Sequence, residues 1–418
     1  MAGGGWSAHA RAAGAGLTLN DFAVLQRDSD NRAHVVLKDG ETLELPTGSA
    51  YQVGSAREVL VGDLWVLAGQ SNMEGIGNLV EVETPIPEVR SYGSSERWTI
   101  AEEPLHWLHE SPRLVHHRLL GCESVPSQYP PRDSQRNKGA GLGLSFAKAH
   151  FNHNSVPVGL IPCAHGATSI AQWQPLLSDD TTLYAATIAR IRDLGGRVAG
   201  ILWFQGESDA MGTDWSSYAT HLTTLLEAFR ADLGQPDLPF LYVQIGRYVT
   251  KPTPELIAGW NAVREAQRCW VKKQHHAAMV SAIDLELDDL IHIGTQGLKR
   301  LGHRLALAAG GHGAPQPELV WLEGNRIHVR FQGIRGHLQA DGRPNGLSLR
   351  DKNGHEYHCI HKVTLEDNTA MLHLTEEPFP PECLLWYGWG LNPHCNMTDT
   401  ADMAVPAFGP ISITQGIP

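Results

Sequence analysis

The chain has 418 residues and a formal net charge of −12, with 42% hydrophobic and 19% charged residues. This composition is typical of a globular protein with a buried core, and the length predicts two or three domains of about 100–200 residues each. The acidic balance argues against a nucleic-acid partner, and no apolar run reaches the ~18 residues that a membrane-spanning helix needs.

Residues 1–60 are expected to form a flexible start and a β-rich segment. The first 16 residues are small and lack the apolar core of a secretory signal, so we expect no signal peptide in the sequence as written. Two runs of alternating apolar residues, 33–38 and 41–45, flank Asp39-Gly40. This dipeptide is a strong signal for a two-residue β-hairpin turn.

Residues 61–312 alternate short apolar runs with amphipathic helical patterns, which predicts an α/β domain. Five buried strands are expected at Asp63–Ala68, Val156–Cys163, Val198–Phe204, Pro239–Ile245 and Ala278–Ile283. Helices are expected between and after them, at 140–152, 181–194, 215–233, 255–275 and 296–310. Parallel strands need crossover connections, so this alternation predicts a five-stranded parallel sheet with helices on both faces.

Residues 313–418 return to β patterning and are expected to form a C-terminal domain that resembles a β-sandwich. Turn signals at Gly324-Asn325, Asn353-Gly354 and Asp367-Asn368 separate short strand-like runs. The aromatic segment LLWYGW at 384–389 has two interpretations, a sandwich core or a wall on which sugars stack.

The cysteines and histidines do not predict a disulfide scaffold or a metal site. The chain contains no C-x-x-C pair, so we expect scattered buried thiols, with one C-terminal disulfide as the alternative. The adjacent pairs His116-His117 and His275-His276 lack carboxylates or cysteines at ligand spacing. The six cysteines are Cys122, Cys163, Cys269, Cys359, Cys383 and Cys395.

Polar residues cluster where the predicted parallel strands end. Ligands collect at the carboxyl ends of the strands in such sheets, so these clusters are expected to converge on one site. The clusters occupy residues 69–73, 164–168, 205–209 and 288–292. The G-x-S-x-G elbow of α/β-hydrolases is excluded, because Met73 stands where its second glycine would be.

Ser71 is the candidate nucleophile of this site. A serine hydroxyl needs a base to take its proton, and His292 is the candidate base. Asp289 is expected to orient the imidazole, with Asp288 as the alternative carboxylate. Donors for an oxyanion are expected from Ser71 N–H, Gly166 N–H and the side-chain amide of Gln205.

Four further residues are candidates for binding substrate: Gln70, Asn72, Glu207 and Trp173. Several of the site candidates also have a structural interpretation, and Glu207 can be a solvated loop charge. A serine after a strand is usually a turn or cap residue, Asp-x-x-His before a helix can be a cap, and Trp173 can belong to the core.

The motifs together resemble those of the SGNH-hydrolase superfamily. The segments are GQSNMEG at 69–75, PCAHGATSI at 162–170, WFQGESD at 203–209 and DLIHIGTQGLKRLG at 289–302. More narrowly, the chain resembles the sialate O-acetylesterase family, which is related to esterases of acetylated plant polysaccharides. This resemblance implies a flavodoxin-like α/β/α core and no cofactor. It also implies deacetylation of an O-acetylated sugar through an acyl-serine, and a secreted or periplasmic location.

The leading hypothesis is therefore a carbohydrate O-acetylesterase that acts through Ser71, His292 and Asp289. An esterase of acetylated xylan or pectin is the first alternative. A carbohydrate-binding protein without catalysis and a lipase on the same core are the others. The sequence leaves the sugar and the oligomeric state open.

Overall fold

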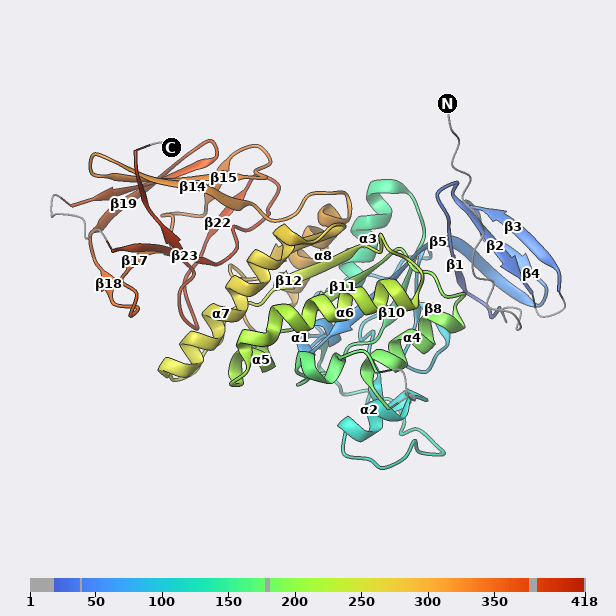
Figure 1. The fold of residues 1–418 in the computed structure, drawn as a ribbon. Helices are drawn as coiled ribbons and strands as arrows, with labels where there is room; N and C mark the ends of the chain where they lie inside the picture. Colours follow the sequence, from blue (N-terminus) through green and yellow to red (C-terminus); the bar gives the residue numbers. More distant parts are fainter. Residues whose placement is uncertain (1–18, 38–39, 177–180, 376–381, 417–418) are drawn as a thin grey trace.

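The computed structural model describes residues 19–37, 40–176, 181–375 and 382–416. Figure 1 shows a central sheet covered by helices, with β-rich segments at its two opposite ends, one N-terminal and one C-terminal. The chain is thus an α/β protein with a mainly parallel central sheet and additional β-rich sheets.

The N-terminal segment is attached to the long strand β5 (Ala56–Gly69). β1 (Val24–Gln26) runs parallel to β5, and β4 (Tyr51–Val53) runs antiparallel to it. β2 (Arg32–Val36) and β3 (Thr42–Pro46) form an antiparallel hairpin, as the alternating pattern predicts. Asp39 of the expected turn lies outside the described residues.

All five predicted buried strands are present and parallel. The strand order β13-β12-β11-β5-β10 puts the first strand in chain order, β5, between the second and the third. The connections therefore lead to opposite sides of β5, and in such sheets ligands bind at the carboxyl end of the strands at this point. The other four strands are β10 (Val158–Pro162), β11 (Gly200–Phe204), β12 (Phe240–Gln244) and β13 (Ala277–Ser281).

The prediction of five strands is wrong at one edge. β7 (Val89–Tyr92) adds a further parallel strand beside β10, and β8 (Trp98–Ile100) pairs antiparallel with β7. β7 is short and carries Arg90 and Ser91, both buried, so it has no apolar run to reveal it. The segment between α1 and α3, which contains β7 and β8, also contains β6 (Gly77–Asn78), β9 (Lys138–Ala140), η1 (Leu108–Glu110) and α2 (Leu114–Leu119).

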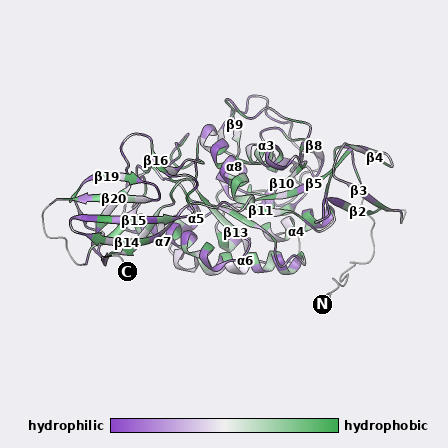
Figure 2. Cartoon of the chain, turned by 90° about the horizontal axis from the view of Figure 1, so that it is seen from above, coloured by the Kyte–Doolittle hydropathy of each residue, from purple (hydrophilic) through white to green (hydrophobic). Residues whose placement is uncertain are grey.

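Helices cover both faces of the sheet. α3 (Gly143–Asn154) and α8 (Thr295–Ala309) pack together on one face, whereas α4 (Leu183–Asp193), α6 (Tyr218–Asp232) and α7 (Pro254–Trp270) cover the other (Figure 1). Figure 2 shows hydrophilic and hydrophobic residues side by side along α6 and α8, as expected of helices with one buried face. Among the described residues, no helix is long and apolar enough to cross a membrane. The short elements are α1 (Ser71–Glu74), α5 (Glu207–Met211), η2 (Ile170–Trp173), η3 (Trp215–Ser217) and η4 (Val271–Lys273).

The C-terminal segment consists of two larger sheets that share one hydrophobic cluster. Two-residue turns at 324–325 and 367–368 join neighbouring strands, as predicted. In the LLWYGW segment, Leu385 and Tyr387 are buried in this cluster. One sheet contains β14 (Gln316–Glu323), β15 (Arg326–Gln332), β19 (Ile360–Glu366), β20 (Thr369–Leu374) and β24 (Thr414–Gln415). The other contains β17 (Leu347–Arg350), β18 (Glu356–Tyr357), β21 (Leu384–Tyr387) and β23 (Phe408–Ser412), and β16 (Leu338–Ala340) pairs separately with β22 (Met397–Asp399).

Two buried arginines of the helices join the C-terminal segment to the central sheet. Arg304 of α8 makes two 2.7 Å contacts with Asp284, and its Nε donates to the carbonyl of Asp402 at 2.6 Å. Arg264 of α7 donates to the carbonyls of Gly388 and Gly390 at 3.1 and 2.5 Å. A buried guanidinium needs such acceptors, so the two parts satisfy each other's polar groups.

The cysteines are free thiols, and the alternative of a C-terminal disulfide is therefore wrong. Cys163, Cys383 and Cys395 are buried, as expected, whereas Cys122 is exposed.

Candidate active site

Ser71 is the first residue of α1, directly after β5 and its turn. Gly69 ends the strand with φ = 133°, and a Cβ there would lie 2.1 Å from the carbonyl oxygen of Phe204, so only glycine fits. The carbonyl of Gln70 then accepts hydrogen bonds from the N–H groups of Met73 and Glu74, both at 2.9 Å. This tight turn presents the Ser71 hydroxyl at the carboxyl end of the sheet.

His292 reaches Ser71 from the loop between β13 and α8. Its Nε2 lies 3.0 Å from Ser71 Oγ, across 221 positions of the chain. Its Nδ1 lies 2.8 Å from Asp289 Oδ2. Ser71, His292 and Asp289 therefore form one continuous line of contacts. The sequence predicts them as nucleophile, base and orienting acid.

Asp289 is held in its ionised form by its surroundings. Burial opposes ionisation, but hydrogen bonds from Ile291 N–H, the His292 ring and His292 N–H, together with Lys138 Nζ at 3.1 Å, outweigh it. The pKa of Asp289 is therefore well below its ordinary value. Asp288, the alternative acid, instead accepts a 2.8 Å hydrogen bond from Asn78 N–H and has no contact with the imidazole.

The predicted oxyanion donors differ in their availability. Ser71 N–H makes no hydrogen bond to a described residue. Gly166 N–H lies beside the serine but donates to Glu74 Oε2 at 2.7 Å. A Cβ on Gly166 would lie 3.2 Å from that oxygen and 3.5 Å from Ser71 Cβ, so the three residues meet at one point.

The prediction of Gln205 as an oxyanion donor is wrong in this structure. Its side chain is fully buried, and its amide donates to Gln70 Oε1 at 3.2 Å, to the Thr168 carbonyl at 3.1 Å and to Asp209. An amide nitrogen has two hydrogens, which these acceptors occupy. Gln205 therefore joins the loops beneath the serine.

The four predicted substrate-binding residues are also buried, and we correct them to structural roles. None exposes more than 3% of its surface. Gln70 Oε1 faces the N–H groups of Gly206 and Ser208, both at 3.3 Å. Asn72 donates to Glu207 Oε1 at 2.7 Å and accepts from Ile293 N–H at 3.0 Å.

Trp173 belongs to the core and not to a cleft wall. Its surface is 0% exposed, its indole N–H donates to Thr168 Oγ1 at 3.1 Å, and its ring meets Trp203 edge to face. A polar cluster at a strand end can thus be a network between loops, which the sequence pattern alone does not distinguish from a binding surface.

Three buried histidines support the loop that carries Gly166. His106 Nε2 accepts a 3.2 Å hydrogen bond from Ala164 N–H, and His165 Nδ1 lies 2.9 Å from His116 Nδ1. Burial lowers the pKa of His106 to about 3 and that of His165 to about 4. These imidazoles are neutral at pH 7 and act as fixed hydrogen-bonding groups.

Four charged residues near the site were missed by the sequence reasoning. Glu74 follows Ser71 by three positions and was visible in GQSNMEG, but no signal assigned it a role. Arg136, Lys138 and Glu103 belong to the insertion at 76–138, which carries no readable motif. Arg136 lies 4.8 Å from the ring of Trp107, and burial raises the pKa of Glu103 to about 7.

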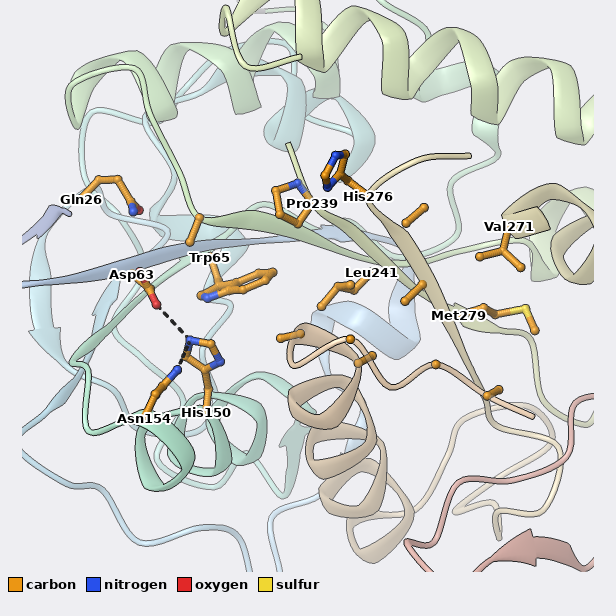
Figure 3. A pocket seen from close by; sticks show the side chains of 18 of the residues that line it. Gln26, Asp63, Trp65, His150, Asn154, Pro239, Leu241, Val271, His276 and Met279 are labelled. Carbon is orange, nitrogen blue, oxygen red and sulfur yellow. Dashed lines mark hydrogen bonds and ion pairs between the residues drawn. The ribbon is translucent and has the colours of Figure 1, made fainter. Parts of the chain in front are cut away.

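A separate cavity of about 850 Å³ lies at the opposite, amino-terminal edge of the sheet (Figure 3). It is lined by Trp65, Leu241 and Met279, with an ion pair of Arg27 and Asp63 at one end. His150 also contacts Asp63 at 3.0 Å, which Figure 3 shows. None of the candidate catalytic residues lines this cavity, so we do not assign it to the reaction. Within the part of the chain that is described, no three His, Cys, Asp or Glu side chains are grouped as metal ligands.

Comparison with known proteins identifies the family of this chain. Residues 61–310 match the family described as SASA, carbohydrate esterase, sialic acid-specific acetylesterase. A probable carbohydrate esterase of Arabidopsis thaliana is 30% identical over 271 residues, which cover 59% of this chain and 89% of that protein.

Two further similarities are more limited. A probable 9-O-acetyl-N-acetylneuraminic acid deacetylase of Escherichia coli is 36% identical over 77 residues, which are 17% of this chain and 22% of that protein. The crystal structure of a carbohydrate acetylesterase from Xanthomonas citri superposes with a TM-score of 0.68 and 22% identity, over 94% of this chain and 98% of that one. This last similarity extends to the β-rich ends, so the whole architecture recurs in a solved protein.

Proposed function

The chain belongs to the SASA family of carbohydrate esterases, and on that basis we propose that it is a serine O-acetylesterase that releases acetate from O-acetylated sugars. The observation that carries the proposal is the line of contacts from Ser71 Oγ to His292 Nε2, 3.0 Å, and from His292 Nδ1 to Asp289, 2.8 Å. Nucleophile, base and orienting carboxylate in this order are the parts of a serine esterase.

In the first half of the proposed reaction, Ser71 Oγ attacks the acetyl carbonyl carbon while His292 Nε2 takes the hydroxyl proton. Asp289 stabilises the imidazolium that results. The N–H groups of Ser71 and Gly166 donate to the oxyanion of the tetrahedral intermediate. The intermediate then collapses, the bond from the acetyl carbon to the sugar oxygen breaks, and that oxygen receives the proton from His292.

In the second half, water attacks the acetyl-serine by the same path. His292 takes a proton from the water, the bond between the acetyl carbon and Ser71 Oγ breaks, and the proton returns to Ser71. Acetate leaves, and the enzyme is restored.

We propose an O-acetylated sialic acid as the substrate to test first. The description of the family names sialic acid. Acetylated xylan and pectin are the alternative substrates. A panel of these compounds, with released acetate as the readout, decides between them, and sugar binding without acetate release would indicate a non-catalytic protein.

The Ser71→Ala variant tests the chemistry itself. We expect kcat for p-nitrophenyl acetate to fall by about three orders of magnitude or more. The melting temperature should stay close to that of the wild type, because the hydroxyl contacts only His292. Full activity in this variant would disprove the proposal.

A further inference from the structure

The Glu74 side chain occupies the Gly166 N–H, which the proposed reaction uses as an oxyanion donor. Ser71 and Glu74 are the first and last residues of the four-residue helix α1, and side chains three positions apart lie on the same helix face. Glu74 Oε2 accepts the Gly166 N–H at 2.7 Å, a short distance typical of a charge-assisted hydrogen bond.

An acetyl oxygen cannot share this position with Glu74. Both atoms would have to lie about 2.7–3.1 Å from the same nitrogen along the direction of its single N–H bond. Two oxygens there would overlap, and one of them would lose the hydrogen bond. The other proposed donor, Ser71 N–H, makes no hydrogen bond to a described residue. Of the two proposed donors of the oxyanion hole, only Gly166 N–H is therefore occupied by Glu74.

If substrate takes Gly166 N–H, the Glu74 carboxylate has a second partner close by. The half-buried Arg136 and the imidazole of His292 both interact favourably with the Glu74 charge, while burial raises the pKa of this carboxyl group. Arg136 itself is fixed by the ring of Trp107, 4.8 Å away, and by a 2.6 Å hydrogen bond from its Nε to the Lys138 carbonyl. The side chain of Glu74 therefore has a nearby cation to turn towards when Gly166 N–H is taken by substrate.

We propose that Glu74 is an internal ligand of the oxyanion hole, which holds Gly166 N–H in the free enzyme and is displaced by the acetyl carbonyl oxygen. This inference rests on the proposed function, because it takes Gly166 N–H as an oxyanion donor. Glu74 competes with acetyl groups and with acetate, and it thereby weakens the binding of substrate and product alike.

The test compares Glu74→Ala and Glu74→Gln with the wild type. Kinetics with p-nitrophenyl acetate give KM and the inhibition constant of acetate, and an NMR titration with isotope-labelled acetate gives its affinity without turnover. Removal of a competing internal ligand raises the population of the competent state, so we expect KM and the acetate dissociation constant to fall by about three- to tenfold in Glu74→Ala. The KM and the acetate dissociation constant of Glu74→Gln should lie between those of Glu74→Ala and the wild type, because a neutral amide oxygen is a weaker acceptor than a carboxylate.

Asp133→Asn is the matched control. Asp133 is an exposed carboxylate that also acts on Arg136 but has no contact with Gly166. This variant removes the same charge from the neighbourhood, and we expect the acetate dissociation constant to change less than about twofold.

Unchanged or weaker acetate binding in both Glu74 variants would overturn the inference, as would an equal gain in Asp133→Asn. Glu74→Gln keeps the shape of the side chain and supports the test if Glu74→Ala does not fold. The proposed function is judged separately by turnover in Ser71→Ala. The affinity of acetate for the Glu74 variants is measured without turnover and therefore concerns Glu74 alone.

Discussion

Asn72 and Ile293 join the turn that carries Ser71 to the loop that carries His292, because the backbone N–H of Ile293 donates to Asn72 Oδ1 at 3.0 Å. The amide of Asn72 also donates to the buried Glu207 at 2.7 Å. The distance from Ser71 to His292 is thus maintained by a side chain that exposes only 3% of its surface.

We expect Asn72→Ala to lower kcat for p-nitrophenyl acetate by about 10- to 100-fold, because small displacements of catalytic groups have effects of this size. KM should change little, since Asn72 is buried. The free energy of unfolding should fall by about 1–3 kcal/mol, since Ile293 N–H and Glu207 lose a buried partner. The exposed Asn137 provides the control Asn137→Ala, and equal kinetics in Asn72→Ala and the wild type would contradict the bridging role.

Asp289→Asn tests the assignment of the orienting acid. An asparagine cannot fix the imidazole as the carboxylate does, so we expect kcat to fall by about two to four orders of magnitude. Asp288→Asn is the matched control, because Asp288 contacts Asn78 N–H and not the imidazole. The assignment fails if Asp288→Asn causes the larger loss in steady-state kinetics.

Lys138→Met should have a small effect that depends on salt. Lys138 Nζ lies 3.1 Å from Asp289 Oδ2, and both side chains are about one third exposed. Such an ion pair contributes about 0.2–1 kcal/mol, so we expect kcat to change by no more than about fivefold. The difference should disappear near 1 M salt, where screening is strong. Lys148→Met, which breaks an ion pair with Glu83, is the control. A difference that persists in high salt would show that Lys138 acts through something other than its charge.

Glu103→Gln should change how stability depends on pH. Burial raises the pKa of Glu103 from 4.5 to about 7 in the folded chain, so the folded state binds this proton more tightly than the unfolded state. The stability from this group is full below about pH 4.5 and is lost as the pH rises through about 7. Glutamine carries no titrating proton, so the variant should gain roughly 3 kcal/mol relative to wild type between pH 4.5 and pH 8.

Urea unfolding of both proteins at several pH values measures this difference. The exposed neighbour Glu102 supplies the control Glu102→Gln, for which we expect no such trend. A constant difference in stability between Glu103→Gln and wild type across this range would contradict the prediction.

The central sheet could be predicted because its buried strands are continuous apolar runs between helical patterns. β7 could not, because Arg90 and Ser91 interrupt its apolar residues and the strand is buried only by tertiary packing, with Arg90 lying over the ring of Phe22. The proximity of Ser71, His292 and Asp289 could be predicted because separate polar clusters follow strands of one sheet. The sequence could not predict which polar side chains are free to contact a substrate. The orientation of Gln205 and Asn72 is set by partners from loops far away in the sequence. The role proposed for Glu74 depends on the same kind of information, namely its distance to Gly166.

The buried arginines of α7 and α8 have a consequence for any attempt to shorten this protein. Removal of the residues after 312 would take away Asp402 from Arg304, and the carbonyls of Gly388 and Gly390 from Arg264. Arg304 would keep Asp284, whereas Arg264 would lose these buried acceptors from the C-terminal segment. We therefore expect removal of the β-rich end to destabilise the α/β part of the chain.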